Sequence, residues 1–79
     1  ALPIYWRTAV MRIKVEIEPE GAIDALRESE GIVKVKEIDD PDANIWVAFK
    51  PSMLEKSISN IIMEKCNTRA EIIESKLMQ

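Results

Sequence analysis

The stretch "AVMRIKVEI", residues 9–17, gives the clearest indication of the fold class. Apolar side chains occupy every second position, and mostly polar ones lie between them. The apolar set is Ala9, Met11, Ile13, Val15 and Ile17. Because successive side chains of a strand point to opposite faces, this alternation predicts a strand with one buried face. We expect Pro19 and Gly21 to end it.

The segment that follows predicts a helix and then a hairpin of two strands. Residues 22–29 form the helix, with Gly31 as its stop, and its apolar face is Ala22, Ile23, Ala25 and Leu26. Residues 32–38 form the next strand, in which Lys34 and Lys36 suit a sheet edge. The turn "DDPDA", residues 39–43, leads into a strand over residues 45–49.

The C-terminal third predicts a second helix and an ambiguous tail. Helical spacing of Leu54, Ile58, Ile61, Ile62 and Cys66 places the helix over about residues 53–66. Residues 69–78 fit a helix through Ala70, Ile73 and Leu77, or a strand with Ile73, Ser75 and Leu77 inward. Helix propensity favours the first reading, whereas a last strand would fill the open side of residues 9–17.

With that last strand, the chain is an α+β protein of the ferredoxin-like β-α-β-β-α-β type. We expect an antiparallel sheet with two helices on one face, in a single domain over residues 1–79. Residues 1–8 are a candidate leader segment preceding the first strand.

Composition excludes several classes of function. A net charge of −3 disfavours a nucleic-acid binder, and no apolar run is long enough to span a membrane. The chain has no histidine and one cysteine, Cys66, which removes ordinary zinc, haem and nucleophile–base sites. We therefore expect a cytoplasmic bacterial or archaeal protein that is not an enzyme and has no cofactor, no metal and no membrane partner.

Two polar groups are candidates for binding. Asp39, Asp40 and Asp42 suit a solvated hairpin turn, a ligand-contacting loop or a divalent-metal site, and Pro41 between them favours the turn. A small basic patch on the open sheet face comprises Arg12, Lys14, Lys34 and Lys36. RNA binding there would need stacking aromatics, for which the chain offers Tyr5, Trp6 and Trp46.

Taken together, four segments resemble the C-terminal effector domain (RAM domain, ACT-like) of the Lrp/AsnC family of prokaryotic transcription regulators. They are "AVMRIKVEIEPEG", "AIDALRESEGIVKVKEID", "NIWVAFKP" and "TRAEIIESKLM". The resemblance implies a module that forms homodimers or higher oligomers and binds a small amino-acid-like effector between protomers. The candidate effector-binding residues are Asp39, Asp40, Asp42 and Asn44.

A second resemblance leads to the alternative function of a dimerising scaffold. The segment "LEKSISNIIMEK", residues 54–65, is similar to the last helix of the small dimerising subunit of the archaeal KEOPS tRNA-modification complex. For either family we expect a dimer interface on the open sheet face. Strand alternation places Val10, Trp46 and Ala48 there as an apolar patch, with Arg12 at its rim.

Overall fold

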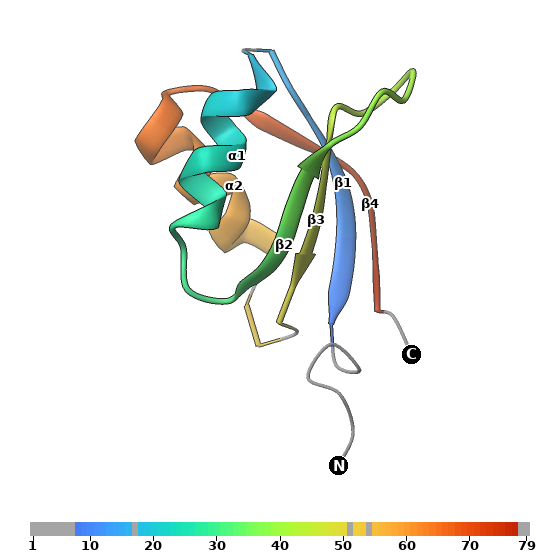
Figure 1. Cartoon of the computed structure of the whole chain (residues 1–79), viewed down its shortest axis with the longest axis vertical. Coiled ribbons are helices and arrows are strands. Elements are labelled where there is room, and N and C mark those ends of the chain that lie inside the picture. Colours follow the sequence, from blue (N-terminus) through green and yellow to red (C-terminus); the bar gives the residue numbers. More distant parts are fainter. Residues whose placement is uncertain (1–7, 17, 51, 54, 78–79) are drawn as a thin grey trace.

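The computed structural model describes residues 8–16, 18–50, 52–53 and 55–77. Its elements, in order, are β1 (Ala9–Val15), α1 (Pro19–Arg27), β2 (Ile32–Glu37), β3 (Ile45–Phe49), α2 (Glu55–Cys66) and β4 (Ala70–Leu77). This order confirms the α+β, ferredoxin-like class (Figure 1). Residues 1–7 of the candidate leader, Ile17 of the first strand and Leu54 of the second helix lie outside the described residues.

The four strands form one antiparallel sheet in the order β2-β3-β1-β4. Both helices cover one face of it (Figure 1). The ambiguous tail is a strand, because Ala70–Leu77 pairs along the whole of β1. Without it the central β1 would present a row of unpaired backbone groups, so pairing outweighs the helix propensity of the tail.

A bulge changes the register of β4 from the simple alternation expected. The pairing shifts between Arg12 and Ile13, so Ser75 lies opposite Met11 but Ile72, rather than Ile73, lies opposite Ile13. A bulge inserts one residue into a strand and strengthens its local twist. β2, the other edge, also has a register shift and bears the exposed Lys34 predicted for an edge.

Helix α1 begins and ends earlier than predicted. Pro19 does not merely end the first strand: it opens the helix, where its fixed φ is suitable and its missing N–H costs nothing. Gly31 does not cap the helix, which ends at Arg27. Instead Gly31 has φ +97° in the turn before β2, and its carbonyl accepts a hydrogen bond from the Lys50 amide at 2.9 Å.

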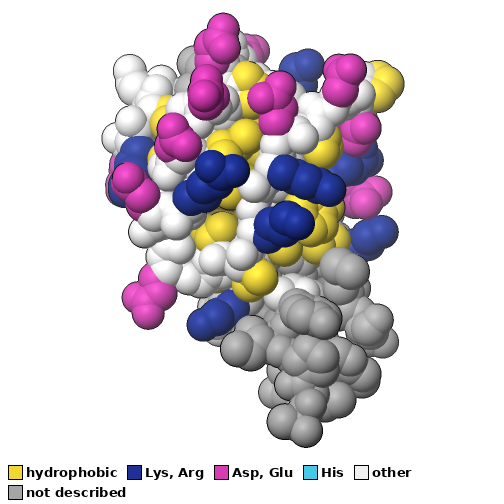
Figure 2. Space-filling view, in the orientation of Figure 1, with side chains coloured by type: hydrophobic (Ala, Val, Ile, Leu, Met, Phe, Trp, Pro, Cys, Tyr) yellow, Lys and Arg dark blue, Asp and Glu magenta, His cyan; other side chains and the backbone are white. Residues whose placement is uncertain are grey.

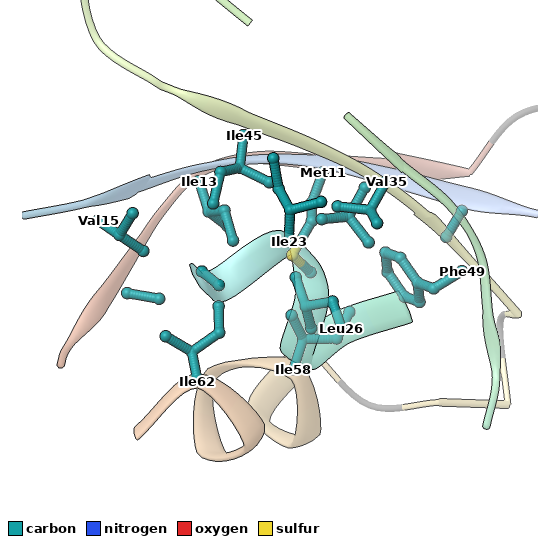
Figure 3. Packing of buried hydrophobic residues seen from close by; sticks show 14 residues of the cluster. Met11, Ile13, Val15, Ile23, Leu26, Val35, Ile45, Phe49, Ile58 and Ile62 are labelled. Atoms are coloured by element: carbon teal, nitrogen blue, oxygen red, sulfur yellow. The ribbon is translucent and has the colours of Figure 1, made fainter. Parts of the chain in front are cut away.

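The core lies between the helices and the inner face of the sheet (Figure 3). The predicted apolar face of α1 is buried, as are Ile58 and Ile62 of α2. Sheet side chains meet them from the other side. The largest fully buried side chains are Met11, Ile13, Leu26, Ile45, Val47, Ile58 and Ile62. Burial of such side chains is the main force that holds so small a domain together.

The face of the sheet away from the helices, here called the outer face, has two cross-strand rows. Residues directly opposite one another in an antiparallel pair share a face, so the register defines these rows. One row is Lys36, Trp46, Arg12 and Glu74, and the next is Lys34, Ala48, Val10 and Lys76. Each row crosses all four strands, and the described helices all lie on the other face.

Candidate functional site

Arg12 is the centre of an ion-pair cluster on the outer face. Its Nη1 donates to a carboxylate oxygen of Asp40 at 3.0 Å and of Asp42 at 3.1 Å, and its Nη2 lies 3.6 Å from Glu74. The pKa of Arg12 is raised above its usual value, chiefly by the hydrogen bond to Asp40, while desolvation opposes the shift. The cluster joins β1, β4 and the loop between β2 and β3.

Two of the three predicted effector carboxylates are therefore occupied by a cation of the same chain. The planar guanidinium of Arg12 presents several donors at once, which suits two neighbouring carboxylates. Asp39, the third carboxylate, is exposed. The order Asp-Asp-Pro-Asp predicted a turn but not the partner of its carboxylates. Arg12 precedes Asp40 by 28 residues, and Glu74 lies on the edge strand β4. Local sequence gives no signal for such a cluster.

Asn44, the fourth predicted effector residue, extends the sheet by means of its side chain. Its Oδ1 accepts a hydrogen bond from the Val15 amide at 3.0 Å, and its Nδ2 donates to the Val15 carbonyl at 2.9 Å. Its backbone amide donates to the Ile13 carbonyl at 3.0 Å, and its carbonyl accepts from the Ile38 amide at 3.1 Å. The side-chain amide thus takes the place of a further β3 residue opposite the end of β1.

The structure brings Asp40, Asp42 and Asn44 together in one loop and uses them in internal contacts. A binding role for these residues and Asp39 stays a prediction, and any ligand would have to compete with Arg12 for the carboxylates of Asp40 and Asp42. Within the described ranges, no group of three or more acidic or cysteine side chains is arranged to hold a metal ion. Cys66 is free and packs, partly buried, against the core.

The predicted dimer interface is less open than the sequence suggested. Val10 and Ala48 lie on the outer face, but each is only 6% exposed. Trp46 is partly buried, and the Lys36 ammonium lies 4.9 Å from the centre of its ring. Arg12 and Trp46 are the members that reach the surface, so the expected patch is not a bare apolar surface. The interface formed by these four residues stays a prediction.

A shallow hollow of about 430 Å³ lies at the other end of the domain from the Arg12 cluster, between the start of β2 and the start of α2. It is lined by Glu30, Gly31, Lys50, Ser52, Met53 and Ser57. It is wide open, and its polar groups come from the turn before β2, from the segment between β3 and α2, and from Ser57 on α2. Sequence patterns had not indicated it, because its lining comes from separate segments.

Comparison with known proteins gives one informative relative. The chain is 62% identical over 74 residues to a protein of Methanothermobacter thermautotrophicus that is named as a homolog of the biopolymer transport protein ExbB. The match covers 94% of this chain and 26% of that protein, so the chain spans about a quarter of the length of the curated relative it matches. No protein-family model matches the chain.

This relative overturns several expectations. The resemblance to an Lrp/AsnC effector domain was wrong, as was the function in transcription regulation that it implied, because the relative is named for biopolymer transport. The KEOPS scaffold is not supported either. The resemblance rested on apolar positions at strand and helix spacing, and different families that have the same fold share such positions.

The expected partners and location are corrected by the same match. A biopolymer transport relative conflicts with an amino-acid effector, with the exclusion of a membrane and with a cytoplasmic location. Neither described helix has the length and apolar character needed to cross a membrane.

Proposed function

We propose that this chain is a binding domain of an ExbB-type biopolymer transport protein and that it catalyses no reaction. The observation that carries the proposal is the 62% identity to the ExbB homolog over 94% of the chain. The match extends over nearly the whole folded domain, which is a far more specific signal than a shared pattern of apolar positions. The domain would then be one part of a longer transport protein.

The contacts of the polar side chains support binding rather than catalysis. Arg12 is paired with three carboxylates, and the Asn44 amide is bonded to the backbone of Val15. Cys66 packs against the core. Side chains fixed in such contacts stabilise the fold, whereas a catalytic group must be free to contact its substrate. The outer face also presents accessible side chains on regular strands, among them Lys34 and Lys36, and such a surface suits the docking of a partner.

Fractionation of cells that make the native protein tests this proposal. An antiserum raised against the purified chain should detect a protein several times larger than 9.0 kDa in the membrane fraction. That protein should resist extraction by alkaline carbonate, which releases proteins bound only at a membrane surface. A 9 kDa band in the soluble fraction, with none in the membranes, would contradict the proposal. A peripheral marker that carbonate does release serves as the control.

A further inference from the structure

The outer face is basic on one half, although the chain as a whole has a net charge of −3. Three exposed lysines lie on the two edge strands: Lys36 is beside Trp46 in one outer-face row, and Lys34 on β2 and Lys76 on β4 are at opposite ends of the other row. We call these four residues the lysine patch. Figure 2 shows basic side chains beside hydrophobic ones over the β2 side of the molecule. Acidic side chains gather along the top of that view, at the end that carries the β2–β3 loop.

The lysines of the patch are weakly engaged, in contrast to Arg12. Within the described residues, no ion pair involves Lys34, and Lys36 contacts the ring of Trp46. The Lys76 ammonium is 3.9 Å from Glu74, and its side chain is 65% exposed. An ion pair so open to water is worth little. The three ammonium groups are therefore available to an anionic partner.

Both ends of the described domain lie at one end of the sheet. At the lysine end of the sheet, β1 begins at Ala9 and β4 ends opposite it at Leu77 (Figure 1). Any segment attached before or after the described domain leaves from this end. The relative is about four times as long as the matched region. The rows of the lysine patch lie on the outer face near this end of the sheet, and the acidic β2–β3 loop lies at the other end.

We propose that the lysine patch rests on the anionic headgroups of a lipid membrane. This inference depends on the proposed function, which puts the attached remainder of the protein in a membrane. The hollow described above lies beside the start of α2 and not on this face, so the patch offers separate, spread positive charges that suit a surface of anionic headgroups. Lysines near an anionic surface are attracted to it, and tryptophan favours the membrane–water boundary.

Sedimentation of the purified chain with lipid vesicles tests the proposal. Vesicles of phosphatidylcholine containing one third phosphatidylserine should bind the chain, and pure phosphatidylcholine vesicles should not. Each lysine near such a surface strengthens binding about five-fold, so Lys34→Gln, Lys36→Gln and Lys76→Gln together should weaken it on the order of a hundred-fold. Binding should also disappear in about 1 M salt, where the Debye length is about 3 Å.

A matched variant distinguishes the effect of the lysine patch on vesicle binding from the effect of the total charge of the chain. Arg27→Gln, Lys56→Gln and Lys65→Gln remove three cations from the exposed surface of the helices, and this variant should bind almost like the wild type. Trp46 gives a second measurement. In a Trp6→Phe background it is the remaining tryptophan, and its emission should change when anionic vesicles are added. Circular dichroism confirms that each variant is folded.

Three results would overturn the proposal. They are equal binding to neutral and anionic vesicles, equal losses in the two triple variants, and capture by an acidic peptide without any vesicle binding. The last would assign the same lysines to a protein partner. Because these measurements use the purified chain, their failure would leave the membrane fractionation of the native protein unaffected. A soluble native protein would in turn contradict the proposed function while leaving the vesicle result intact.

Discussion

Replacement of Asn44 by alanine tests whether this residue holds the sheet or awaits a ligand. Asn44→Ala removes the two hydrogen bonds between the side-chain amide and the backbone of Val15. A hydrogen bond contributes about 1 kcal/mol net, and a partner left unpaired away from water costs more, so we expect a loss of about 2 kcal/mol. For a domain of this size, that loss lowers the melting temperature by about 8–16 °C.

Urea unfolding followed by far-UV circular dichroism measures the change. The midpoint should fall while the slope of free energy against urea stays constant, because the surface exposed on unfolding is the same. Asn60→Ala is the matched control, since Asn60 is exposed on α2, and its effect should stay within about 0.5 kcal/mol. If Asn44→Ala is as stable as this control, the side-chain pairing with Val15 does not hold the sheet together.

The Asn44→Asp substitution separates hydrogen bonding from packing, because the two side chains have nearly the same shape. A carboxylate can still accept a hydrogen bond from the Val15 amide, but its other oxygen would face the Val15 carbonyl oxygen and repel it, because both are acceptors. We expect a loss at neutral pH similar to that of alanine, and a smaller loss in acid, where a protonated carboxyl group can donate. A loss that does not change with pH would instead point to a packing defect.

Three further predictions concern the rest of the fold. Arg12→Gln should speed amide hydrogen exchange in the loop of residues 38–44, and unchanged exchange would contradict the ion-pair role. Because the pKa of Arg12 is raised, its ion pairs in the wild type should stabilise the loop through mildly alkaline pH, and this stabilisation is lost as pH rises through the raised pKa. Ile13→Val should lower the free energy of unfolding in urea by about 1 kcal/mol, whereas Ile72→Val, at a side chain 36% exposed, should lower it much less. Equal losses of stability would show that Ile13 is not the more deeply buried of the two. Gly31→Ala should destabilise the fold by more than about 1 kcal/mol, because φ is +97° and the new Cβ would lie 3.1 Å from Met53 Sδ. Gly21→Ala in α1 should instead stabilise it by about 0.5–1 kcal/mol, so the melting temperatures of the two variants should shift in opposite directions.

The pattern of apolar residues predicted the fold of this chain but not its function. The same spacing of apolar residues that identified the ferredoxin-like fold also suggested a transcription regulator, and the fold was confirmed while the regulator was not. Spacing records which side chains face a core, and this requirement is common to all proteins with one fold. Identity position by position with the ExbB homolog also includes surface residues, which the core does not constrain.

Elements with a local pattern could be predicted from the amino-acid sequence. Alternation over residues 9–15 defined β1, and helical spacing defined the buried face of α1, because each periodicity reflects the geometry of a single element. On local pattern alone, residues 70–77 fit a helix or a strand, and the open side of the first strand favoured the strand. The assembled sheet confirms the strand by pairing it along β1. Tertiary structure alone decided the Arg12 cluster, whose members meet only after β1, β4 and the hairpin loop are assembled. Contacts between distant segments depend on register and on the bulge in β4, and neither is encoded by the spacing of residues within one element.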